Sequence, residues 1–159
     1  MSSTKQPKKR VLIVEDEQTI HKMLVEKFTL EGFEVFSAID EAAEFKRDFK
    51  QLLKKFKSLE EDFEIFQSVA LKAFHKLDQE NLGIVQIPGL GFEHPKVYKA
   101  TKFACKSLKG KGAASGIRVV YAHYPNVDRL LFIEIYFKAD QENHDRERIQ
   151  RLLKVWKEF

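Results

Sequence analysis

The stretch SGIRVVYAHY, Ser115–Tyr124, decides the fold, because it predicts the middle strand of a sheet over Ile117–His123. Two further strands are predicted along the chain on either side of it, over Val97–Ser107 and Arg129–Phe137. The connections LKGKGAASG and YPNVD are short, so the three strands are expected to form an antiparallel meander. In the last strand, alternation places four apolar residues on one face: Leu131, Ile133, Ile135 and Phe137.

Helical patterns flank these strands in the sequence. Before them, a helical hairpin is predicted, with a first apolar stripe at Phe45, Phe49, Leu52 and Phe56 and a second at Leu59, Phe63, Phe66 and Ala70. Ser58 and Glu61 have the S-x-x-E spacing of a capping box ahead of the second helix. We expect the aromatic residues to be core. After the strands, an amphipathic helix begins near Asn143 and has its apolar residues at Ile149, Leu152, Leu153 and Trp156.

The N-terminal part has a different organisation. VLIVEDEQTI, Val11–Ile20, begins with a buried strand that ends in carboxylates. A helix over Gln18–Glu31, ended by Gly32, and a second strand over Phe33–Ile39 complete a parallel β-α-β unit. We therefore divide the chain into a disordered basic leader (1–9), this segment (10–43) and an α+β domain (44–159), with the strand 33–39 open to use by either part.

The composition excludes several classes of protein. The chain is 43% hydrophobic and contains fourteen Phe, enough for a real core, and no apolar run approaches the roughly 18 residues of a membrane span. The one cysteine, Cys105, excludes an internal disulfide and fits a reducing cytoplasm. The five His residues show no metal-ligand spacing, so we expect neither a structural metal nor another cofactor.

Positive charge is concentrated in one window of the sequence. From Lys96 to Arg118 there is no acidic residue. This window contains seven basic residues: Lys96, Lys99, Lys102, Lys106, Lys109, Lys111 and Arg118. Since the whole chain has a formal charge of +4, the rest of it carries −3. Such a block indicates either a surface for a polyanion or an ordinary solvated lysine face.

The first forty residues, with RVLIVEDE and QTIHKMLVEKFTLEGFEVFSAIDEAAE, resemble the start of a response-regulator receiver domain. The resemblance implies that Glu15 and Asp16, as in receivers, help to hold Mg²⁺. The third strand with its phosphorylated aspartate is missing, because the nearest candidates, Asp48 and Asp62, lie in helical patterns. Glu15 and Asp16 are thus weak metal candidates, and we expect no phosphotransfer.

The rest of the chain resembles the RelE/ParE toxin superfamily. The residues that carry this are EFKRDFKQLLKKF, PKVYKATKFACKSLKG, SGIRVVYAHY and DRLLFIEIYFKADQENHDRERI. The resemblance implies a helical hairpin packed on an antiparallel sheet with a C-terminal helix, and it assigns Phe33–Ile39 as the opening strand of that sheet. The N-terminal β-α segment is then an appendage.

RelE-like toxins are small ribonucleases that cut messenger RNA on the ribosome, and the RNA's own 2′-hydroxyl attacks, leaving a cyclic phosphate. Such a site positions the backbone, moves protons and stabilises phosphate charge, without a metal. The resemblance implies that Arg118 binds the phosphate and that Lys99 is a catalytic or phosphate-binding lysine, with His144 as a candidate acid. The lysines expected to bind RNA are Lys96, Lys102, Lys106, Lys109 and Lys111.

Some positions leave alternatives open. Where related nucleases carry an arginine after the last strand, Ala139 and Asp140 occupy the turn, and Lys138 is the nearest cation. Tyr121 is expected in the core, and His123 is a weaker candidate for proton transfer. A ParE-like toxin that binds DNA gyrase, or an inactive relative, is the alternative function; a phosphorylation-regulated signalling protein is a third. Either toxin implies a cognate antitoxin as a partner.

Overall fold

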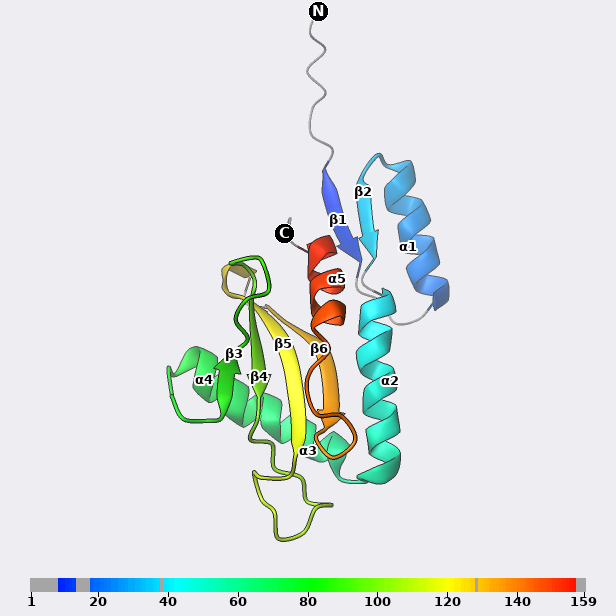
Figure 1. Ribbon diagram of the computed structural model, residues 1–159. Coiled ribbons are helices and arrows are strands. Elements are labelled where there is room, and N and C mark those ends of the chain that lie inside the picture. The colour runs from blue at the N-terminus through cyan, green and yellow to red at the C-terminus, as the bar shows by residue number, and fades with distance from the viewer. Residues whose placement is uncertain (1–8, 14–17, 38, 128, 157–159) are drawn as a thin grey trace, which may run out of the picture. The chain divides into compact units, whose positions relative to one another are not determined.

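A computed structural model describes residues 9–13, 18–37, 39–127 and 129–156 of the chain (Figure 1). The chain divides into two compact units, Met1–Ala43 and Glu44–Phe159. The predicted leader lies outside the described residues except for Lys9. Among the described residues, no helix is both long enough and apolar enough to cross a membrane.

The first unit contains the predicted parallel β-α-β arrangement, formed by β1 (Arg10–Ile13), α1 (Gln18–Leu30) and β2 (Glu34–Ser37). Gly32 ends the helix at a φ of 84°, a backbone conformation that residues other than glycine adopt only at a cost in free energy. The Phe33 amide donates to the Phe28 carbonyl, and the two rings meet edge to face at 5.7 Å. This is the Schellman closure with its hydrophobic contact.

The assignment of Phe33–Ile39 to the toxin-like sheet is wrong. In the structure β2 pairs in parallel with β1, in register from Arg10 opposite Glu34 to Ile13 opposite Ser37. The larger sheet is made of β3, β4, β5 and β6. The strand that both resemblances include therefore belongs to the local β-α-β unit.

A helical hairpin opens the second unit. It consists of α2 (Ile39–Lys55), which begins in the first unit, and of a continuous segment made by α3 (Leu59–Ile65), the π-helix η1 (Phe66–Leu71) and α4 (Lys72–Lys76). The predicted capping box does not form. Ser58 is helical at φ −84°, makes no side-chain cap, and donates instead to the Asp62 carboxylate at 2.6 Å. Glu61 pairs with Lys106, so the S-x-x-E residues tie the hairpin to the segment after β4.

The four-stranded antiparallel sheet has the order β3-β4-β5-β6, with β3 at Ile84–Gln86, β4 at Lys96–Ala100, β5 at Ile117–Tyr124 and β6 at Arg129–Phe137. The three predicted strands thus form the expected meander. The first of them is shorter than predicted, because after Ala100 the backbone bonds to loops: Thr101 to Gly83 and Phe103 to Ala113. The strand β3 was not predicted, since it lies in a segment rich in glycine and proline.

Aromatic packing between the hairpin and one face of the sheet forms the core. Figure 1 shows the α3–α4 segment running behind the strands. Phe63 lies 5.0 Å from Phe132 and Phe66 lies 5.3 Å from Phe103, between ring centroids. Burying one such side chain stabilises the fold by roughly 1.5–3 kcal/mol. The aromatic residues predicted as core therefore hold the hairpin on the sheet.

The C-terminal helix α5 (Arg146–Trp156) contacts β6 and buries Ile149, Leu152 and Leu153. It begins slightly later than the predicted Asn143, because Asp145 caps it by accepting a bond from the Arg148 amide at 2.9 Å. The chain from Glu44 onward is thus an α+β unit with helices before and after an antiparallel sheet.

Candidate functional site

The predicted arginine and lysine lie on one face of the sheet. Arg118 in β5 is opposite Tyr136 in β6, and Lys99 in β4 is opposite Val120, two residues after Arg118. Directly opposed residues of antiparallel strands point to the same face, and so do residues two apart along one strand. Lys99, Arg118 and Tyr136 therefore share a face, the one opposite to that of the hairpin-facing Tyr121.

Arg118 is half-buried, and its guanidinium is fixed by backbone carbonyls. Its Nη1 donates to the Thr101 oxygen at 2.6 Å and to the Ile117 oxygen at 3.1 Å. A guanidinium has five N–H donors, and its Nε and Nη2 bond to no other residue in the part of the chain that the structure describes. The side chain is thus held on a rigid strand with donors left over for an anion.

His144, in the connection between β6 and α5, lies within electrostatic reach of Lys99. Burial lowers the pKa of His144 below its usual value of 6.5, and the charges of Lys99 and Arg146 lower it further, against an opposing effect of Asp145. Both ring nitrogens are buried and have no hydrogen-bond partner among the described residues. Buried polar groups are usually hydrogen-bonded, so the two ring nitrogens are an exception that leaves the imidazole free to bond to a ligand.

Two residues of this face were missed by the sequence analysis. Tyr136 is buried, and burial raises the pKa of its hydroxyl, with Glu134 raising it and Arg118 lowering it. Glu134 is 2% exposed, and burial raises the pKa of its carboxyl, against three opposing partners. The signal was present as an acid inside an apolar strand, in LLFIEIYF. A buried acid of this kind needs partners, and so points to a specific arrangement.

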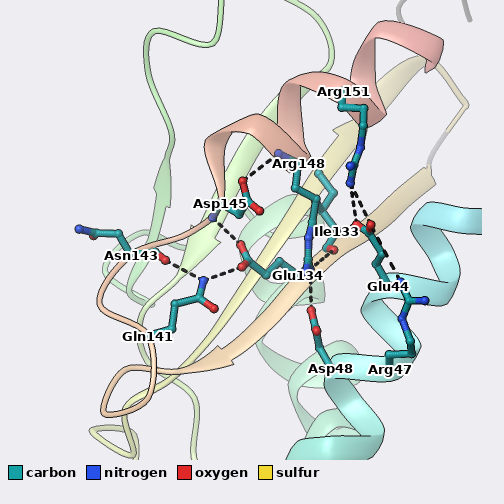
Figure 2. A network of polar contacts seen from close by, with 10 residues as sticks. All are labelled: Glu44, Arg47, Asp48, Ile133, Glu134, Gln141, Asn143, Asp145, Arg148 and Arg151. Carbon is teal, nitrogen blue, oxygen red and sulfur yellow. Dashed lines mark hydrogen bonds and ion pairs between the residues drawn. The ribbon is translucent and has the colours of Figure 1, made fainter.

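Glu134 organises the turn that carries His144 (Figure 2). Its two oxygens accept one bond each, from the Gln141 amide at 2.6 Å and from the Asp145 backbone at 2.9 Å. Gln141 also donates to the Asn143 carbonyl at 2.7 Å. The connection between β6 and α5 is therefore fixed from inside the sheet, and His144 lies between residues that Glu134 holds.

The same network reaches α2. Arg148 on α5 pairs with Asp48 and with Glu44, in the latter case at 3.2 Å, and Arg151 donates to both oxygens of Glu44 at 2.9 Å (Figure 2). Asp48 and Asp62 lie in the helices α2 and α3, as the sequence predicts. Arginine forms such paired bonds with carboxylates because its donors are planar and fixed. The ion pairs join the first and last helices of the second unit.

The predicted face of the last strand is wrong for Leu131. A register shift between Val120 and Tyr121 places Phe132 opposite Tyr121 and Leu131 opposite Ala122, whereas Ile135 stays opposite Val119. One extra residue in a strand reverses the facing of everything beyond it. The alternation in the sequence does not show where such a bulge falls.

The lysines of the basic window do not form one surface patch. Lys96 lies on the hairpin side of β4, opposite His123, and thus on the other face from Lys99. Lys106 pairs with Glu61, and Lys102 donates to the Asn81 carbonyl at 3.2 Å. Lys109 and Lys111 are exposed in the loop before β5.

The turn after the last strand has a cation, but from another element. Lys55 of α2 lies 3.0 Å from Asp140 and 4.8 Å from the Phe137 ring. Ala139 and Lys138 are exposed.

Tyr121, which the sequence analysis placed in the core, is completely buried. Its hydroxyl lies 2.9 Å from the His75 Nε2, and the ring of His123 contacts that of His75.

The metal candidates Glu15 and Asp16 lie outside the described residues. Within the described ranges, no group of three or more His, Cys, Asp or Glu residues is arranged to hold a metal ion.

Comparison with known proteins places the chain in no family: no protein-family model matches it, and neither a curated protein nor a solved structure is similar to it at a significant level.

Proposed function

We propose that residues 44–159 form a RelE/ParE-like toxin that cuts messenger RNA on the ribosome without a metal. The observation that carries the proposal is the placement of Lys99, Arg118 and Tyr136 on one sheet face, with His144 within electrostatic reach of Lys99. Helices before an antiparallel sheet and one helix after it are the order that this superfamily resemblance implies. The proposal includes a cognate antitoxin and a cytoplasmic location.

The chemistry follows from the charges on this face. The RNA's 2′-oxygen attacks the adjacent phosphorus and loses its proton to a base, while the 5′-oxygen leaves and takes up a proton, giving a 2′,3′-cyclic phosphate. Arg118 stabilises the phosphate charge, because its planar fork donates to two oxygens at once. Lys99 adds a second positive charge at the same phosphate.

The environment of His144 favours the role of base over the predicted role of acid. Its lowered pKa keeps the imidazole neutral at pH 7, ready to accept the 2′-hydroxyl proton. The ring nitrogens are buried, so RNA reaches them only when the turn between β6 and α5 moves. The hydrogen bonds from that turn to Glu134 fix the position of the turn relative to β6.

The burial of the His144 ring nitrogens supports a second candidate function, a ParE-like or inactive toxin without nuclease activity. In that case Arg118 serves mainly to satisfy the carbonyls of Thr101 and Ile117. The partner is then DNA gyrase, or none, and the exposed surfaces rather than the sheet face make the contact.

The deciding experiment is translation-coupled mRNA cleavage in the presence of EDTA. We expect Arg118→Ala to lose roughly a hundred- to a thousand-fold in rate, about 3–4 kcal/mol, as when one donor to a developing oxyanion is removed. Arg118→Lys should recover little, because the fork is lost. Arg129→Ala, at an exposed position at the start of β6, is the matched control and should keep its activity.

Each outcome selects one function. Cleavage by the wild-type protein that Arg118→Ala leaves unchanged overturns the assigned site. No cleavage together with inhibition of gyrase supercoiling supports the ParE-like candidate. Neither activity indicates an inactive relative, provided that circular dichroism shows all proteins to be folded.

A further inference from the structure

A pocket of about 460 Å³ lies on the hairpin side of the sheet, where β4 begins and β5 ends. Its size falls in the usual range for small-ligand sites, about 300–1,000 Å³. Tyr98 is opposite the core residue Tyr121 and thus points to the other face from Lys99 and Arg118. The pocket is therefore separate from the proposed cleavage site.

Aromatic rings form one wall of the pocket, and they hold one another in place. Tyr98 stacks on Tyr121 with ring centroids 5.7 Å apart. A hydrogen bond of 2.9 Å joins the His75 Nε2 and the Tyr121 hydroxyl. His75 and His123 lie 4.1 Å apart between centroids, and Phe74 meets Tyr98 edge to face at 5.6 Å. A wall built in this way is rigid before any ligand arrives.

Two residues of the wall, His75 and Tyr98, are neutral at pH 7. Burial, together with the nearby His123 and Lys76, lowers the pKa of His75 to about 4, and burial raises the pKa of the Tyr98 hydroxyl. Neutral Tyr, His and Phe rings are the surfaces on which unpaired nucleic-acid bases stack.

Polar groups line the rest of the pocket. Asp78, Gln79 and Glu80 follow the end of α4, and Lys96 lies at the start of β4. Asp78 has a φ of 48°, so the chain turns sharply at this point. The pocket thus offers carboxylate acceptors, an amide and the Lys96 ammonium beside the aromatic wall.

We infer that this pocket binds a nucleobase with an exocyclic amino group, guanine above all. The base stacks on the wall formed by Tyr98, His75 and His123. A carboxylate of Asp78 or Glu80 accepts the adjacent N1–H and N2–H donors of guanine, which uracil lacks. Lys96 takes the phosphate. The inference goes beyond RNA cleavage and does not depend on it, because binding needs no residue of the Arg118 face.

The test is titration of the whole protein with GMP, UMP and ribose 5-phosphate, followed by NMR of the imidazole signals at pH 7. We expect GMP to shift the signals of His75 and His123 and to bind more tightly than UMP, with ribose 5-phosphate weakest. A single-stranded uridine oligoribonucleotide with one guanine distinguishes the sources. Tighter binding than GMP assigns the base to an RNA chain, and equal binding assigns it to a free nucleotide.

Matched variants separate the wall from the polar groups. The double variant Asp78→Asn, Glu80→Gln should bind GMP no better than UMP. The control double variant Glu60→Gln, Glu64→Gln, on the exposed side of α3, should keep the preference.

Tyr98→Leu should weaken every nucleotide roughly five- to a hundred-fold, the range for one lost base–aromatic stack, while Tyr98→Phe should not. The inference fails if GMP shifts only signals outside the pocket. It also fails if UMP or ribose 5-phosphate binds as well as GMP, or if no nucleotide binds at millimolar concentration.

Discussion

The two faces of the four-stranded sheet differ in what they bury. Under the hairpin, rings such as Phe66, Phe103 and Phe132 pack against one another. The face of Arg118 also buries apolar residues, such as Val97 and Val120, but among them it holds an arginine, a buried tyrosine and a buried glutamate. Apolar packing needs only shape and volume, whereas a buried charge needs particular partners. Both faces therefore stabilise the fold, and only the second has the polar groups from which a site is built.

The largest loss in the free energy of unfolding should come from a substitution in the aromatic face. Phe103 is 1% exposed and contacts Phe66, so Phe103→Ala removes a full ring and leaves a cavity. We expect a loss of about 3–5 kcal/mol in the free energy of unfolding, measured by urea denaturation. Leu77→Ala, at a residue that is 61% exposed, should change it by about 0.5 kcal/mol or less. Similar losses for both would contradict the aromatic core.

Removal of the acid from the polar face should have a smaller effect. Glu134→Ala leaves the Gln141 and Asp145 donors without their acceptor, and we expect a loss of about 2 kcal/mol in urea denaturation. Glu134→Gln keeps one oxygen and should lose less. Glu142→Ala, at an exposed position of the same turn, is the control. If Glu134→Ala is as stable as that control, the network does not hold the turn.

The two His residues with lowered pKa values make stability depend on pH. Unfolded histidine binds its proton near pH 6.5, but folded His75 does so only near pH 4. Between these values the unfolded state binds more protons, so the stability present above pH 6.5 is lost as the pH falls toward 4. His144 acts in the same direction.

His75→Gln should therefore flatten, but not abolish, the fall in unfolding free energy between pH 7 and pH 5. His94→Gln, at an exposed position, is the control. A slope in His75→Gln equal to that of the wild-type protein would mean that His75 is protonated equally in both states.

The smallest effects should come from single lysines of the basic window. Lys109 and Lys111 have no partner in the described part of the chain, whereas Lys106 pairs with Glu61 and Lys102 bonds to a carbonyl. Each phosphate neutralised on single-stranded RNA contributes about 0.7 to the slope of log affinity against log salt. The Lys109→Ala, Lys111→Ala pair should lower that slope by about 1.4, and the Lys102→Ala, Lys106→Ala pair by less. Equal slopes in all proteins would make the window a solvated face.

Periodicity predicted the elements well and their exact ends less well. The hairpin, the three strands and the final helix follow from apolar spacing that one sequence shows directly. The capping box at Ser58 and the common face of the last strand were wrong, because Ser58 bonds to Ser107, 49 residues away, and the facing of the last strand depends on its pairing with β5. The Ser58 hydroxyl also donates to the nearby Asp62 carboxylate, and the register shift between Val120 and Tyr121 places Leu131 on the opposite face. The strand β3 carries too few residues for a periodic signal.

The sequence by itself determined which residues are apolar, where the charges gather and that Arg118 lies in a middle strand, because these depend on local order. Only the tertiary structure decided which strand β2 pairs with, that Lys99 shares a face with Arg118 while Lys96 does not, and that Glu134 fixes the turn of His144. Strand register and buried partners depend on residues far apart in the chain, and local spacing carries no record of them.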